Sequence, residues 1–219
     1  RRFGKTVCMI NHLIRSALLS KLKNPRFAYI APTFKQAKSI AWDYMKQFTA
    51  KIPHTKFNET ELRVDLPNGS RITLLGSESP DGLRGIYLDG CVIDEYANVN
   101  SKLFPEIIRP ALSDRKGYCV FIGTPMGMNN NFYELYQHAQ GAEDWFNYKA
   151  KASDTKIVDE DELVKAKEVM GDKKYLQEFE CDWIANIEGA VYGDVIGKLD
   201  DQKQLSRVPY DPSLPVSTA

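Results

Sequence analysis

Residues 1–19 have the sequence RRFGKTVCMINHLIRSALL, and the tripeptide Gly4-Lys5-Thr6 near its start decides how the chain is interpreted. Apolar residues follow at helical spacing, which predicts a helix directly after the glycine. In a phosphate-binding loop, backbone amides at a helix N-terminus hold the phosphates, the lysine neutralises them and the hydroxyl binds Mg²⁺. The full pattern is Gly-x-x-x-x-Gly-Lys-[Ser/Thr], and its first glycine would fall just before residue 1. The tripeptide alone therefore leaves open a basic N-terminus that contains these residues by chance.

The composition is that of a globular chain with no overall charge. The 219 residues are 43% apolar, and 29 basic residues balance 29 acidic ones. Zero net charge argues against a surface that is basic all over, but not against a local basic face. The four cysteines contain no Cys-x-x-Cys pair and the three histidines show no metal-ligand spacing, so buried free thiols in a reducing compartment are predicted. No stretch approaches the ~20 apolar residues that span a membrane.

Strand-like and helix-like segments alternate up to about residue 150. A hairpin is predicted around Asn68-Gly69, the strongest short turn signal, because apolar residues alternate before it and return after it. The alternation of strands with helices indicates an α/β fold with a largely parallel central sheet flanked by helices. The predicted strands cover residues 26–33, 62–66, 71–75, 90–93 and 118–122, and the predicted helices cover residues 5–22, 34–52 and 131–140.

The pattern changes after residue 152. Asp159 and Glu162 are spaced as a helix N-cap with its return partner, and Gly171 predicts the end of that helix. A second helix is expected over residues 172–183, so these segments form a small helical appendage. The tail beyond holds several prolines and no periodicity, which is typical of a linker.

The segment CVIDE at residues 91–95 supplies the acidic partner that a phosphate-binding loop needs. It predicts a buried strand that places Asp94 and Glu95 at the carboxyl edge of the sheet, where ligands of open α/β sheets bind. Asp94 can hold Mg²⁺, and Glu95 can orient and deprotonate an attacking water. An acidic turn after a strand is the alternative, and the combination with Gly-Lys-Thr favours the site.

Two further segments carry polar side chains that can reach a phosphate. CVFIGTP at residues 119–125 predicts a strand that places the Thr124 hydroxyl at the same sheet edge, able to touch the γ-phosphate or the water. Gly82 and Gly85 flank Arg84 in a loop that can present a guanidinium to phosphate. The alternatives are a simple turn at Thr124 and a solvated arginine in the loop.

In this order, the segments resemble the ATPase domain of the large terminase subunit, the DNA-packaging motor of tailed bacteriophages and prophages. The resemblance rests on RRFGKT, GLRG with CVIDEYANV, IIRPAL, FIGTPMGMNNNFYELY, and YLQEFECDW with GAVYGDV, which together span nearly the whole chain. It implies a P-loop core of the ASCE type with a helical lid, followed by an RNase H-like nuclease domain. We therefore expect a P-loop ATPase core over residues 1–152, a helical lid or linker over 153–188, and a linker toward the nuclease domain over 189–219.

The resemblance also implies roles for individual residues. The implied nucleotide-binding residues are Arg2, Gly4, Lys5 and Thr6 of the Walker A loop, with Asp94 and Glu95 as the Walker B pair. Thr124 resembles the coupling motif that links hydrolysis to movement. Arg84 resembles the arginine that neighbouring subunits offer in trans, and Arg1 resembles a loop arginine that senses the γ-phosphate. Arg109, in IIRPAL, is expected to be structural.

The predicted function is the ATPase motor of a viral DNA-packaging terminase, which uses ATP and Mg²⁺ to translocate double-stranded DNA into a capsid. The implied partners are DNA, the portal protein, the small terminase subunit and further copies in a homo-oligomeric ring, in the host bacterial cytoplasm and without a membrane. The loop's first glycine, an upstream adenine-contacting segment and the nuclease domain are not in this sequence, so a longer protein is expected. The alternatives are a superfamily 2 helicase-like ATPase, which would need a second RecA-like domain, and a non-catalytic P-loop module for assembly or DNA binding.

Overall fold

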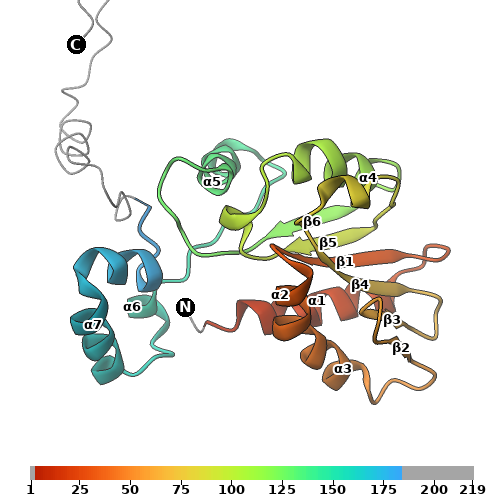
Figure 1. Ribbon diagram of the computed structural model, residues 1–219, viewed down its shortest axis with the longest axis horizontal. Coiled ribbons are helices and arrows are strands. Elements are labelled where there is room, and N and C mark those ends of the chain that lie inside the picture. Colours follow the sequence, from red (N-terminus) through yellow and green to blue (C-terminus); the bar gives the residue numbers. More distant parts are fainter. Residues whose placement is uncertain (1–2, 184–219) are drawn as a thin grey trace, which may run out of the picture.

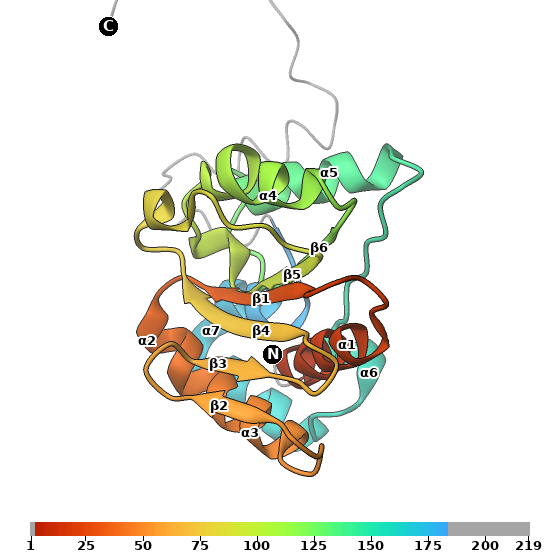
Figure 2. The ribbon, with the colours of Figure 1, turned by 90° about the vertical axis from the view of Figure 1, so that its right-hand side faces the viewer.

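The computed structural model describes residues 3–183, and its centre is a six-stranded sheet (Figure 1). From one edge to the other, the strands lie in the order β2-β3-β4-β1-β5-β6 (Figure 2). They are β1 (Arg26–Ala31), β2 (Lys56–Asn58), β3 (Arg63–Asp65), β4 (Arg71–Gly76), β5 (Gly90–Ile93) and β6 (Tyr118–Phe121). Neighbours that are not consecutive in sequence are joined by crossovers, as in other α/β folds.

Parallel pairing dominates the part of the sheet that carries the candidate site. The central strand β1 is parallel to both of its neighbours, β4 and β5, and β6 is parallel to β5. Only β2 and β3, beyond β4, pair in antiparallel fashion. The expectation of an α/β fold with a largely parallel sheet is confirmed. The carboxyl ends of β4, β1, β5 and β6 therefore meet at one edge of the sheet.

Helices cover both faces of the sheet. One face carries α1 (Lys5–Leu19) and a helical segment made of α2 (Phe34–Ala37), a π-helical turn (Lys38–Trp42) and α3 (Asp43–Thr49). The other face carries a π-helical turn (Leu103–Ile108), α4 (Arg109–Ser113) and α5 (Asn131–Gly141). Each face has its own apolar core, because strands of a parallel sheet must be covered on both sides. Along β5, Val92 faces the core of α1, whereas Cys91 and Ile93 face the opposite core.

Three local predictions are corrected. The first helix ends at Leu19 rather than at residue 22, because Ser20 is already extended. The helix predicted over residues 34–52 ends at Thr49 and contains a π-helical turn. Cys8 was expected to be a buried thiol but is exposed. The reason is helical geometry, since the buried stripe of α1 consists of Ile10, Leu13, Ile14 and Ala17.

A short helix and a long helix follow α5 and lie beyond the carboxyl edge of the sheet (Figure 1). They are α6 (Ala152–Thr155) and α7 (Glu160–Phe179). Asp159 caps α7 by accepting the amide of Asp161 at 2.9 Å, and Gly171 interrupts the helix with a φ of 75°. The domain boundaries at residues 152 and 188 stay predictions, and the expected linker 189–219 lies outside the described residues. Within residues 3–183, no helix has the length and hydrophobicity that crossing a bilayer requires.

Candidate active site

The first turn of α1 begins at the carboxyl edge of the sheet. Gly4 precedes this helix with φ +81° and ψ 14°, a left-handed conformation that glycine adopts without a steric penalty. Its carbonyl accepts the amide of Cys8 at 2.9 Å, so the helical ladder starts at once. Lys5 and Thr6 therefore stand at a helix N-terminus, where unpaired backbone N–H groups and the helix dipole favour anions.

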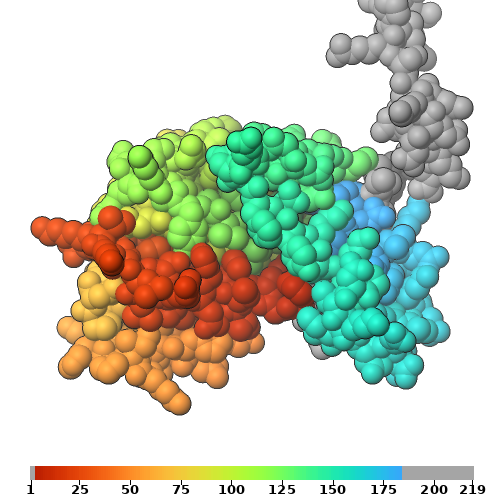
Figure 3. Space-filling view, turned by 180° about the vertical axis from the view of Figure 1, so that it is seen from behind, coloured from red at the N-terminus to blue at the C-terminus, as the bar shows by residue number. Residues whose placement is uncertain are grey.

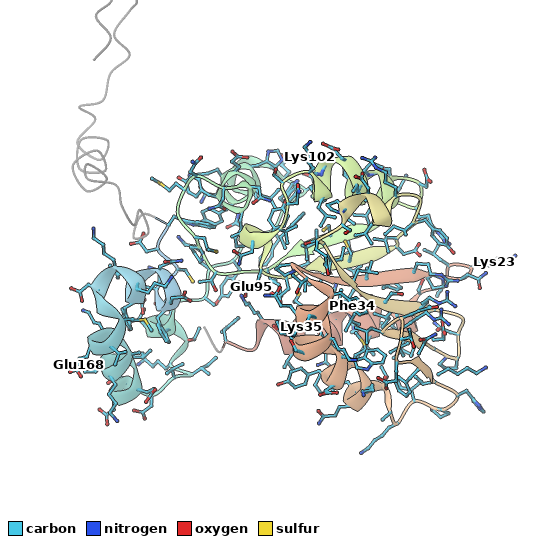
Figure 4. The ribbon with its side chains drawn as sticks, viewed as in Figure 1. Lys23, Phe34, Lys35, Glu95, Lys102 and Glu168 are labelled. Carbon is cyan, nitrogen blue, oxygen red and sulfur yellow. The ribbon has the colours of Figure 1, made fainter. Side chains whose placement is uncertain are left out.

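Lys5 and Glu95 form an ion pair across 90 residues of sequence. The Nζ of Lys5 donates a hydrogen bond of 2.9 Å to Oε1 of Glu95. Their side chains are 29% and 35% exposed, so a ligand can reach both. Figure 4 places Glu95 at the edge of the sheet that faces α7. The lysine of the tripeptide and the second acid of CVIDE are thus in direct contact.

Asp94 is buried, and both of its carboxylate oxygens are engaged. Oδ1 accepts the amide of Glu95 at 2.8 Å, while Oδ2 accepts the hydroxyl of Tyr29 and lies 3.4 Å from Oγ1 of Thr6. Burial raises the pKa of Asp94, and the hydrogen bond from Tyr29 and the charge of Lys5 oppose that rise. Burial also raises the pKa of Tyr29, and the nearby Asp94 adds to it, so the phenol stays protonated and acts as the donor.

The backbone of Glu95 is in the left-handed region, with φ 47° and ψ 48°, which is uncommon for a residue with a side chain. Side chains alternate along β5, and an extended Glu95 would point to the same face as Cys91 and Ile93, away from α1. The left-handed turn instead lets Glu95 meet Lys5. Backbone conformations of this kind concentrate at functional sites.

A cavity of about 1550 Å³ runs beside β6 and reaches the start of α1. Lys5, Thr6 and Thr124 all line it, so Thr124 shares a space with the helix N-terminus. No hydrogen bond in the described part of the chain joins the Thr124 hydroxyl to the two acids. In Figure 3 the start of α1 lies against the segment that leads to α6, and the rings of Phe3 and Tyr148 there are 6.3 Å apart.

Gln177 of α7 joins the helical appendage to the loop that contains Thr124. Its side chain is buried, and Nε2 donates a hydrogen bond of 2.7 Å to the carbonyl of Pro125. Its Oε1 accepts a hydrogen bond of 3.2 Å from Lys174. Since Pro125 directly follows Thr124, this contact anchors α7 beside the predicted coupling motif.

The structure does not bring Arg84 into the Lys5–Glu95 cluster. Its guanidinium lies 2.8 Å from Asp81 and 3.6 Å from Glu106, and the side chain is 56% exposed. Among the described contacts, none joins Arg84 to the residues around α1. Arg1 and Arg2, which were predicted to contact the nucleotide, lie outside the described residues.

Sequence reasoning missed Tyr29 and Gln177. Tyr29 lies within the apolar run RFAYIA and was expected to serve the core. A usable signal was present, because a tyrosine in a fully buried strand needs a hydrogen-bond partner for its hydroxyl. Gln177 gave no comparable signal, since its burial depends on how α7 packs.

Comparison with known proteins gives the family. The family described as terminase large subunit, T4likevirus-type, N-terminal, matches residues 1–193. The chain belongs to this family. Two curated terminase relatives, the large subunits of Thermus phage G20c and Thermus virus P23-45, are each 30% identical to it over 126 residues. The aligned segment makes up 49% of this chain and 26% of each relative, so it spans about a quarter of those terminases.

Solved structures of large terminases share the fold. The large terminase ATPase domain of Thermus phage P74-26 matches with a TM-score of 0.71 at 22% identity, covering 84% of this chain and 85% of that one. A large terminase from a thermophilic bacteriophage, solved in complex with ADP, matches with a TM-score of 0.71 at 16% identity, covering 83% and 46%. The HK97 bacteriophage large terminase gives 0.57 at 15% identity, covering 93% and 43%. The mixed α/β fold is therefore the P-loop NTPase fold of terminase ATPase domains, as the sequence predicted.

Proposed function

We propose that this chain is the ATP-hydrolysing motor of a DNA-packaging terminase, which couples ATP hydrolysis to the translocation of double-stranded DNA into a capsid. The observation that carries the proposal is the convergence of Lys5, Thr6, Asp94 and Glu95 at one edge of a P-loop sheet. Membership of the terminase large subunit family supports it, as does the likeness to a domain described as a large terminase ATPase domain.

The proposed nucleotide is ATP. The N-terminus of α1 presents backbone N–H groups, and Lys5 adds an ammonium beside them, so the site suits a chain of phosphates. The large terminase of the thermophilic bacteriophage was solved with ADP and with ATP-γ-S, which supports a nucleotide site on this fold. Gly4 and Arg2 are proposed to complete the loop around the phosphates.

The proposed metal ion is Mg²⁺, and the donor set fits it. The hydroxyl of Thr6 and the carboxylate of Asp94 are oxygen donors 3.4 Å apart. Within residues 3–183, no group of three or more His, Cys, Asp or Glu side chains forms an all-protein metal cage. Mg²⁺ is usually held by one or two protein oxygens together with substrate phosphates and water. When bound, it neutralises charge on the β- and γ-phosphates.

The chain's own side chains then divide the chemistry. Lys5 exchanges Glu95 for the phosphates and neutralises their charge. Glu95, freed from the ion pair, accepts a proton from the attacking water. Asp94 keeps its orientation toward Thr6, because the Glu95 amide and the Tyr29 hydroxyl hold its two oxygens. Thr124, which lines the same cavity as Lys5, links hydrolysis to movement of the loop that Gln177 anchors.

Two arginines are proposed to add positive charge in the transition state. Arg84 is exposed and held by Asp81 and Glu106 of its own chain, so it is available to a neighbouring subunit's site. A planar guanidinium that acts in trans in this way contributes ~10³–10⁵ in rate in other P-loop enzymes. Arg1 is proposed to sense the γ-phosphate from the phosphate loop.

The proposed partners follow from the family. They are double-stranded DNA, a portal protein, a small terminase subunit and further copies of the same chain in a ring. The proposed location is the cytoplasm of a host bacterium during phage assembly.

The proposal is tested with the full gene product in an ATPase assay and a DNA-translocation assay. We expect double-stranded DNA to stimulate ATP hydrolysis, and translocation to require ATP and Mg²⁺. ATP-dependent strand separation would favour a helicase-like enzyme instead. Nucleotide or DNA binding without turnover would favour a non-catalytic P-loop module.

A further inference from the structure

Tyr29 is a polar residue in the buried part of the sheet's central strand. Its neighbours in β1, Phe27, Ala28, Ile30 and Ala31, are all apolar and buried. Tyr29 itself is 0% exposed, and its ring belongs to the core on the α1 side. Its hydroxyl reaches out of that core to Oδ2 of Asp94. Phenylalanine would fill nearly the same space, so the hydroxyl itself requires an explanation.

The register of the sheet brings Tyr29 to Asp94. Tyr29 lies opposite Val92 in the parallel pairing of β1 with β5. Asp94 follows Val92 by two residues, so its side chain points to the same face of the sheet. Diagonal neighbours on adjacent strands lie within reach of an aromatic side chain. Thr6, in the first turn of the helix that covers this face, completes a group of three oxygens.

We propose that Tyr29 is a positioning residue of the cation site, whose hydroxyl holds the Asp94 carboxylate toward Thr6. The inference rests on the proposed function of this site. Tyr29 touches neither the nucleotide nor the metal ion, and it acts through Asp94. The two carboxylate oxygens have separate anchors, because Oδ1 is held by the Glu95 amide and Oδ2 by Tyr29. Loss of the second anchor lets the carboxylate rotate away from Thr6 while its charge remains.

A competing role for this hydroxyl is to serve the fold alone. Buried charges need hydrogen-bond partners, and Tyr29 could simply satisfy Asp94 within the core. The two roles differ in what Tyr29→Phe changes. A positioning role predicts weaker binding of the metal ion, with folding and metal-free nucleotide binding retained. A purely structural role predicts a loss of stability with no selective change in metal affinity.

The test measures Mn²⁺, in place of Mg²⁺, bound to the full gene product by electron paramagnetic resonance in the presence of ATP-γ-S. Tyr29→Phe is expected to raise the apparent Kd of Mn²⁺ by roughly 10- to 100-fold, the usual effect of losing a hydrogen-bond partner behind a metal ligand. The affinity for ATP-γ-S in EDTA should stay unchanged. Tyr118→Phe is the matched control, because Tyr118 lies beside Gly90 at the opposite end of β5 and should leave Mn²⁺ binding unchanged.

A double-mutant cycle with Asp94→Asn supplies the second readout. In the Asp94→Asn background, Tyr29→Phe should cause no further loss of Mn²⁺ affinity, because it acts through that carboxylate. Unchanged Mn²⁺ affinity in Tyr29→Phe, or an additive loss in the double variant, would overturn the proposal. So would a Tyr29→Phe protein that does not fold, because the hydroxyl would then be a requirement of the core. Failure of the unmodified protein to bind Mn²⁺ with ATP-γ-S would contradict the proposed function instead.

Discussion

The ammonium of Lys5 lies 2.9 Å from Oε1 of Glu95, so the residue proposed to neutralise phosphate and the residue proposed to activate water are counterions of each other. The two side chains come from the start of α1 and the end of β5. A phosphate chain at the N-terminus of α1 competes with Glu95 for the same ammonium. Nucleotide binding is therefore expected to release the carboxylate at the moment when it is needed as a base.

Replacing Lys5 should remove nucleotide binding. Loss of its charge-assisted contact to phosphate in Lys5→Ala should cost about 3 kcal/mol, or ~10²-fold in Kd. Titration of the full gene product with a fluorescent ATP analogue measures this. Lys23→Ala, at the opposite end of the sheet (Figure 4), is the control and should bind normally. Normal affinity in Lys5→Ala would show that the phosphates lie elsewhere.

Gly4 should be required for its backbone conformation alone. A side chain at Gly4 would meet no atom within 4 Å, but φ is +81°. Gly4→Ala should therefore lower the free energy of unfolding by about 1–2 kcal/mol, the cost of a left-handed residue, and should weaken ATP binding. Urea denaturation measures the first effect. Gly82→Ala is the matched control, because Gly82 is equally open and lacks a positive φ. Equal effects in the two variants would remove the conformational argument.

Arg84 should act between subunits. Its partners Asp81 and Glu106 are exposed, so Arg84→Ala should change the free energy of unfolding by at most about 1 kcal/mol. ATP affinity should remain, whereas DNA-stimulated hydrolysis should fall by ~10³-fold or more. Arg109→Ala is the control and should hydrolyse ATP normally.

Mixing Arg84→Ala with Lys5→Ala protein should partly restore hydrolysis. Some interfaces of a mixed ring would pair an intact phosphate loop with an intact Arg84. An inactive mixture, in an assembly that demonstrably contains both variants, would mean that Arg84 acts within its own chain or only in folding. Arg1 would then become the better candidate for the transition-state arginine.

The contact between Gln177 and Pro125 should hold α7 in place. Gln177→Leu leaves the buried Pro125 carbonyl without its donor, which should cost about 1–3 kcal/mol of stability. Hydrogen exchange should speed up along α7 more than in the sheet. Gln140→Leu, at an exposed position of α5, is the control and should change neither quantity. Unchanged exchange in Gln177→Leu would show that other contacts hold this helix.

The fold was predictable because its elements have clear local patterns. The apolar run before Asp94 and the helical spacing after Lys5 place both residues at element ends, and parallel strands bring such ends to one edge. Asn68-Gly69 likewise marked the hairpin that the structure contains. Boundaries were less accurate, because the end of α1 depends on Ser20 and not on the apolar pattern.

The contacts of the site depend on tertiary register that no local pattern contains. Tyr29 reaches Asp94 only because β1 pairs with β5 so that Tyr29 faces Val92. Glu95 reaches Lys5 only through a left-handed turn, which its residue type disfavours. Arg84 was predicted as a free loop side chain, and its pairing with Glu106 depends on how two distant turns pack.

Glu95→Gln tests the central claim most directly, because it removes the base and keeps the shape. The measurement is single-turnover ATP hydrolysis, with ATP-γ-S binding determined on the same preparation of the full gene product. Binding in Glu95→Gln should be retained, while hydrolysis should fall by at least ~10²-fold, the usual contribution of a positioned general base. Glu168→Gln, on α7 (Figure 4), is the control and should hydrolyse ATP normally. A Glu95→Gln protein that binds and hydrolyses ATP at the normal rate would contradict the account.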